Sequence, residues 1–117
     1  MNTILIQLPL ITDKKAEFEA MLHHEEGIAL TSQQKGFISA EFGYTTDEEG
    51  NLKWNLWEKW ETQEDFANYN QIPERLDDSK FMQTLGAVLA GPPSMLWLDE
   101  VESRSPAYFI FSPAQRT

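Results

Sequence analysis

The chain contains no cysteine and few basic side chains, and each shortage excludes some partners. Without cysteine it can form no disulfide and offers no thiolate to a metal. This composition fits a reducing compartment, so we expect a cytoplasmic protein. Nineteen acidic residues against nine Lys and Arg give a formal net charge of −10, which disfavours nucleic acids and anionic membranes as partners.

Long apolar runs and nucleotide-binding signatures are also missing. No apolar run approaches the roughly 18 residues of a membrane span, and residues 1–10 lack the basic start of a signal peptide. The sequence has no GxGxxG, P-loop or nucleophile-elbow pattern. His23 and Glu26 stand at a spacing that could share a metal, but no further ligands gather near them. We therefore expect no metal and no cofactor.

The apolar pattern predicts one α+β domain with the ferredoxin-like order β-α-β-β-α-β. The expected elements are a strand at 3–8, a helix at 12–34, strands at 37–46 and 52–60, helical segments at 63–70 and 79–90, and a strand at 95–101. This order is typical of an antiparallel sheet with helices on one face. We assign residues 1–102 to the domain and 103–117 to an extension, with a short edge strand at 108–111.

Alternation along the strands divides the sheet into two faces. The helix-facing side collects Ile4, Ile6, Leu8, Ile38, Ala40, Phe42, Tyr44, Trp54, Leu56 and Trp60. The opposite side carries Phe37, Glu41 and Trp57 among polar residues, and large aromatics there favour a subunit interface. We expect a homodimer through this face; the alternative is a monomer with a partly apolar sheet surface.

Glu25 is the sharpest candidate site that the residues give alone. A continuous helix places it within an apolar stripe made by Phe18, Met21, Leu22, Ile28 and Ala29. A carboxylate among apolar groups has a raised pKa and suits a general base. Two structural interpretations stay open: Gly27 ends the helix and turns Glu25 to water, or Glu25 pairs with a lysine at the rim.

The segment LWEKWETQEDF at residues 56–66, together with Tyr69 and the Pro92-Pro93 pair, resembles the antibiotic biosynthesis monooxygenase family. The likeness covers about residues 1–102, and Trp60 is its best anchor. It implies a dimeric α+β barrel with a pocket between sheet and helices. Some members oxygenate phenols, quinols or polyketide-type substrates there without metal or flavin, and others degrade haem.

Individual residues give this resemblance mixed support. Trp60 matches the family's strand-end tryptophan, but the Asn of some oxygenases falls at Leu56 and a helical Tyr at Phe66. The haem-ligating His falls near Leu85, so haem degradation is not expected. Asn55, Tyr69 and Glu25 are the side chains that would compensate for the missing polar groups.

Three hypotheses follow. The first is a cofactor-independent monooxygenase acting on a small aromatic substrate, with Glu25, Tyr69 and Asn55 as catalytic groups. Its pocket would be lined by Trp60, Phe42, Leu22, Phe66 and Phe81. The second is a non-catalytic dimeric domain that binds a small apolar ligand. The third is a structural dimer whose tryptophans form only a core.

Overall fold

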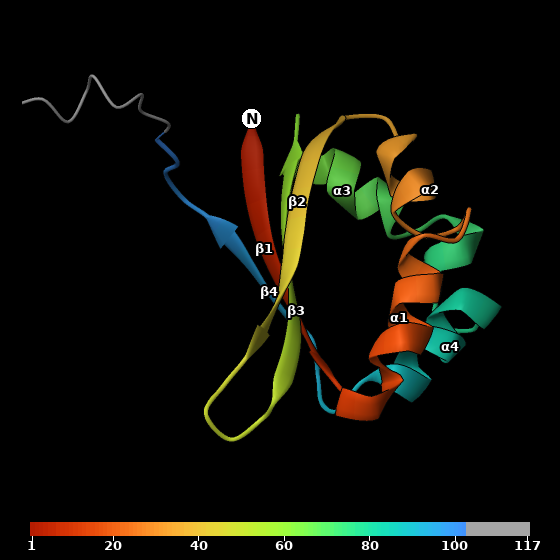
Figure 1. Cartoon of the computed structure of the whole chain (residues 1–117). Helices are drawn as coiled ribbons and strands as arrows, with labels where there is room; N and C mark the ends of the chain where they lie inside the picture. The colour runs from red at the N-terminus through yellow and green to blue at the C-terminus, as the bar shows by residue number, and fades with distance from the viewer. Residues whose placement is uncertain (103–117) are drawn as a thin grey trace, which may run out of the picture.

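A four-stranded antiparallel sheet carries all the helices on one of its faces (Figure 1). The computed structural model describes residues 1–102, so the strand expected at 108–111 lies outside the described residues. The strands are β1 (Asn2–Leu10), β2 (Phe37–Thr46), β3 (Leu52–Trp60) and β4 (Ser94–Leu98), in the order β2-β3-β1-β4. Strands β1 and β2 run in the same direction with β3 between them, as the ferredoxin-like order requires.

The helical layer consists of short pieces. They are η1 (Thr12–Lys14), α1 (Lys15–Leu22), α2 (Ile28–Ser32), α3 (Gln63–Tyr69), η2 (Pro73–Arg75) and α4 (Lys80–Val88). Side-chain caps start two of them: Thr62 accepts from the Asp65 backbone N–H at 3.0 Å, and Ser79 from that of Met82 at 3.1 Å. Ser79, directly before α4, is therefore the N-cap of that helix. None of the helices in residues 1–102 has the length and apolarity needed to cross a membrane.

The expected continuous helix over residues 12–34 is wrong. Helix α1 ends at Leu22, and α2 starts only at Ile28. Gly27 explains the break, because a Cβ there would collide with the carbonyl oxygens of Met21 and Leu22. The chain can therefore turn back against the end of α1 only with glycine at this position.

The face assignment is confirmed for β1 and β3 and partly wrong for β2. Ile4, Ile6, Leu8, Leu52, Trp54, Leu56 and Trp60 are all buried on the helix side. A bulge between Phe37 and Ser39 shifts the start of β2 by one residue. Phe37 therefore packs edge-on against Trp60 at 5.5 Å between ring centroids, while Ile38 is exposed. Glu41 does pair with Trp57 on the outer face.

Candidate active site

A pocket lies between the sheet and the helical layer. Its volume is about 150 Å³, close to that of an engineered apolar cavity that admits benzene. Ile6, Leu8, Trp54 and Leu56 form its sheet wall, and the helices contribute Phe18, Met21, Leu22, Ile28, Phe66, Phe81, Met82 and Leu85. Met95 of β4 also lines it and is mostly exposed, so the pocket reaches the surface there.

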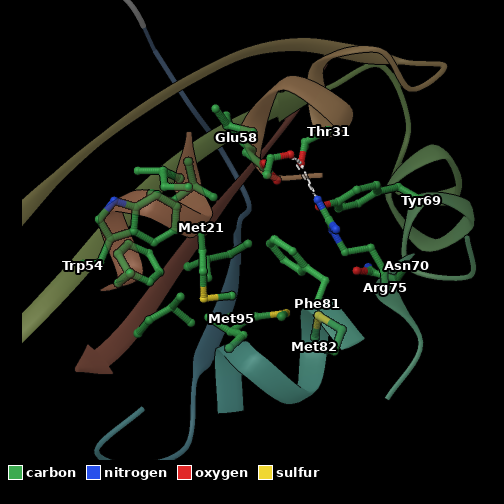
Figure 2. Close-up of a pocket in the computed structure, with 18 of the residues that line it drawn as sticks. Met21, Thr31, Trp54, Glu58, Tyr69, Asn70, Arg75, Phe81, Met82 and Met95 are labelled. Atoms are coloured by element: carbon green, nitrogen blue, oxygen red, sulfur yellow. Dashed lines mark hydrogen bonds between the residues drawn. The ribbon is translucent and has the colours of Figure 1, made fainter. Parts of the chain in front are cut away.

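The polar groups of the pocket gather at one end (Figure 2). We call Thr31, Glu58, Tyr69 and Arg75 the polar end. Met21, Met82 and Met95 lie away from it and form the methionine end. Thioethers are flexible and polarisable and adapt to irregular ligands. The polar end can therefore select the chemical group of a ligand, and the methionine end can adapt to ligands of different shape.

Arg75 is the centre of the polar end. The short η2 turn that starts at Pro73 delivers its side chain, which is 9% exposed. Its Nη2 donates to the carbonyl oxygens of Glu26 at 2.5 Å and Gly27 at 3.1 Å, so it joins η2 to the turn between α1 and α2. The guanidinium also stacks over the Phe81 ring at 4.4 Å.

Tyr69 fixes the orientation of this guanidinium. Arg75 Nε donates to the Tyr69 hydroxyl at 2.6 Å, and that hydroxyl lies 2.8 Å from Thr31 Oγ1. Because the tyrosine oxygen accepts from Arg75, its own proton is free to go to Thr31. The Tyr69 ring in turn stacks on Trp60 at 5.4 Å. The cation is thus held by a network that begins in the core.

Glu58 is the other charged group at the polar end. It stands in β3 at 1% exposure and accepts a hydrogen bond from Trp60 Nε1 at 3.1 Å. Burial raises the pKa of its carboxyl, and the Trp60 N–H and the charge of Arg75 partly oppose that rise. A buried carboxyl with a raised pKa is suited to take up a proton.

Glu58 and Arg75 do not form an ion pair. The ion pairs found within residues 1–102 join Lys14 to Glu17 and His23 to Glu19, both at the surface. The same part of the chain holds no group of three side chains that could bind a metal ion. The polar end therefore places a carboxyl and a guanidinium on one apolar pocket, and the two groups form no ion pair.

This geometry can be compared with known proteins. The antibiotic biosynthesis monooxygenase family model matches residues 1–77, well over half of the chain. The chain belongs to the antibiotic biosynthesis monooxygenase family. None of the curated protein sequences matches it significantly.

Solved structures share the fold at low sequence identity. A protein of Nitrosomonas europaea that carries the same family name is 16% identical, with a TM-score of 0.69 over 87% of this chain and 100% of that one. The monooxygenase ActVA-Orf6 of Streptomyces coelicolor, in complex with nanaomycin D, is 17% identical, with a TM-score of 0.64 over 90% and 91%. SnoaB, a cofactor-independent oxygenase of Streptomyces nogalater, is 16% identical with the same TM-score over 86% and 94%.

Some of the residues expected to line a family pocket do so here. Leu22, Phe66 and Phe81 all line it. Trp60 does not line it, because it is fully buried behind Tyr69 and Glu58. Phe42 does not line it either; its side chain is 40% exposed, and its ring centroid lies 5.6 Å from that of Trp54.

The three expected catalytic residues are not brought together. Glu25 is exposed in the turn after α1, so its expected place within an apolar stripe is wrong. Asn55 lies on the opposite face of the sheet. There it accepts from Gln7 at 2.9 Å and donates to Thr45 Oγ1 at 3.1 Å, and these bonds satisfy it within the fold. Only Tyr69 reaches the pocket.

Sequence reasoning missed Glu58 and Arg75. Glu58 shares the parity of Trp54, Leu56 and Trp60, so alternation already places its carboxylate on the helix-facing side. No sequence pattern of this kind indicates a role for Arg75. Its role depends on carbonyl groups 48 and 49 positions earlier in the chain, and no local pattern reports them.

Proposed function

We propose that this protein is a cofactor-independent monooxygenase that acts on a small phenol- or quinol-type aromatic substrate in this pocket. Membership of the family supports a monooxygenase-type reaction. The observation that carries the proposal is the placement of a buried carboxyl and a buried guanidinium on one apolar pocket. Phenol oxygenation needs a proton acceptor, a group that stabilises the phenolate, and a dry surrounding.

The reaction balances without an added reductant. A phenol loses its hydroxyl proton, and its ring carbon then passes an electron to O₂. The radical pair combines into a carbon-bound peroxide. The O–O bond breaks, one oxygen stays as a quinone carbonyl, and the other leaves as water with two hydrogens of the substrate. Phenol and O₂ thus give quinone and water.

The side chains of the polar end take distinct roles in this proposal. Glu58 accepts the phenol proton, since burial has already raised its pKa. Arg75 stabilises the phenolate, and Tyr69 with Thr31 holds the guanidinium in position. The apolar walls keep water away from the peroxide. Glu58 thereby replaces Glu25 as the proposed general base.

Oxygen consumption with a panel of phenols and quinols tests the proposal. We expect turnover with ¹⁸O from ¹⁸O₂ in the quinone product, and a loss of about 10²-fold or more in kcat for Glu58→Gln. Glu61→Gln, which removes an exposed carboxylate near the end of the same strand, is the matched control. Glu25→Gln tests the competing base.

Two results would contradict the proposal. Turnover that needs Glu25 and survives Glu58→Gln would assign the base elsewhere. No oxygen uptake with any phenol or quinol, together with an aromatic ligand retained in native mass spectrometry, would favour the non-catalytic ligand-binding domain.

We further propose that two copies associate through the outer face of the sheet. The strand register aligns Glu41, Trp57, Leu5 and Leu96 across all four strands. Trp57 is 47% exposed and Leu96 62% exposed, and aromatics of this kind are enriched at subunit interfaces. Phe37 leaves the proposed interface, because the bulge turns it to the core.

Sedimentation velocity of a Trp57→Glu variant tests this association. A glutamate in the middle of an apolar contact adds an unpaired charge. We therefore expect the unmodified protein to sediment as a dimer and the Trp57→Glu variant to sediment as a monomer at micromolar concentration. Lys53→Glu, on the same face of β3 but nearer the hairpin, is the control for added charge. A monomeric unmodified protein would exclude the interface.

A further inference from the structure

Within residues 1–102, neither the Glu58 carboxyl nor the Arg75 guanidinium has an ionic partner, although both are buried at the polar end of the pocket. Burying a charge costs free energy unless it is paired or hydrogen-bonded. Arg75 meets this cost mainly with carbonyl and hydroxyl oxygens and with the Phe81 ring. Glu58 has the single Trp60 N–H. Neither side chain uses the other, although both line the same pocket.

Each group keeps hydrogen-bonding capacity that the fold does not use. Trp60 occupies Oε1 of Glu58, and no hydrogen bond within residues 1–102 reaches its second oxygen. Nε and Nη2 of Arg75 are engaged, whereas Nη1 has only a 3.5 Å contact to the Glu74 carbonyl. Figure 2 shows both side chains at the same end of the pocket. An acceptor and a donor are therefore both available at the polar end.

The signs of these groups select the chemistry of a ligand. A carboxylate ligand would be attracted by Arg75 but repelled by Glu58. An ammonium ligand would be attracted by Glu58 but repelled by Arg75. A neutral, weakly acidic hydroxyl suits both, because one oxygen donates its proton to the carboxylate and accepts from the guanidinium. The cavity of about 150 Å³ has room for a single aromatic ring behind that hydroxyl.

We propose that the pocket recognises its ligand through one ring hydroxyl inserted between Glu58 and Arg75, which selects neutral phenols over aromatic acids, amines and hydrocarbons. This rests on the proposed function in placing the substrate in this pocket, but it concerns binding alone. The same bridge would align the phenol proton with Glu58 before any reaction with oxygen.

Anaerobic binding of three probes of similar size tests the inference. The probes are 4-methylphenol, 1,4-dimethylbenzene and 4-methylbenzoate, titrated into the full chain and followed by NMR shifts of the Thr31 and Tyr69 amides. We expect 4-methylphenol to bind at least about tenfold more tightly than either of the others, since a site that bonds a hydroxyl rejects analogues without it. Equal affinity for phenol and hydrocarbon would overturn the inference.

Variants then identify the groups responsible. Glu58→Gln keeps the side-chain shape and should reduce the preference for phenol to about threefold or less, while Glu61→Gln leaves it unchanged. Arg75→Lys should weaken phenol binding as well. If it fails to fold because Arg75 also holds the turn before α2, Glu58→Gln decides alone. An unchanged preference in Glu58→Gln would contradict the bridge.

Binding and turnover separate the two proposals. A phenol preference without oxygen uptake would keep the bridge and reject the monooxygenase. Oxygen uptake with equal affinity for phenol and hydrocarbon would keep the monooxygenase and reject the bridge.

Discussion

The two ends of the pocket differ in how firmly their side chains are held. At the polar end, Arg75 is bound by two carbonyls and a tyrosine, and Tyr69 stacks on a fully buried Trp60. At the methionine end, no hydrogen bond within residues 1–102 holds the side chains of Met21, Met82 or Met95, and Met95 is 57% exposed. Fixed donors give orientation, and flexible thioethers give tolerance to shape. This contrast predicts a site strict about one functional group and permissive about the rest of the ligand.

The largest expected difference is in the free energy of unfolding. Trp60→Ala removes a side chain that contacts Phe37, Phe66 and Tyr69, so we expect a loss of about 3–5 kcal/mol. Met95→Ala at the other end should cost less than about 1 kcal/mol, because its side chain is already mostly in water. Urea unfolding measures both values. Similar losses would show that the two ends are equally part of the core.

A smaller contrast is expected between two tyrosine hydroxyls. Tyr69→Phe leaves Arg75 Nε without its acceptor and leaves Thr31 Oγ1 only its 3.4 Å contacts to the Gly27 carbonyl and to Arg75 Nη2, which should cost about 1.5–3 kcal/mol. Tyr44→Phe loses one bond to the carboxylate of Glu19, which water can replace, and should cost less than about 1 kcal/mol. Thermal unfolding of the two variants gives the comparison. If Tyr44→Phe lost more unfolding free energy than Tyr69→Phe, the hydrogen bonds of Tyr69 in the pocket would not be the more important ones for stability.

The parts of the fold that follow period-2 alternation could be predicted from the sequence. Strands β1 and β3 are long and paired on both sides, so a single register fixes which side chains are buried. The start of β2 could not, because one bulge residue moves Phe37 to the opposite face from the one its parity indicates. A bulge depends on pairing across strands and leaves no mark in a single run of residues.

The site was less predictable than the fold for a related reason. The helical wheel that placed Glu25 in an apolar stripe assumed a continuous helix, and the close approach of Gly27 to α1 interrupts it. Glu58 was accessible from parity, since it alternates with Trp60. The sequence alone does not single it out as a site residue, because its partner Arg75 comes near it only in the folded chain.

The pH dependence of stability gives the smallest effect and the most specific one. The carboxyl of Glu58 has its pKa raised by burial above the ordinary value of 4.5. Well below pH 4.5 the group is protonated in both the folded and the unfolded state and adds no pH dependence. As the pH rises, the unfolded chain ionises first, so stability falls until the pH passes the folded pKa. Glu58→Gln cannot titrate and should lack this loss.

The difference in unfolding free energy between Glu58→Gln and the unmodified protein reports the contribution of Glu58 ionisation alone, because all the other acidic residues are common to both proteins. We expect the variant to gain relative stability as the pH is raised from 4 to 8, measured by urea unfolding at each pH. Glu61→Gln, in which the removed carboxylate is exposed, sets the scale of general charge effects. A relative gain toward low pH would mean that Arg75 and Trp60 outweigh burial. The polar end would then hold its carboxylate ionised and resemble a structural ion-pair network more than a proton acceptor.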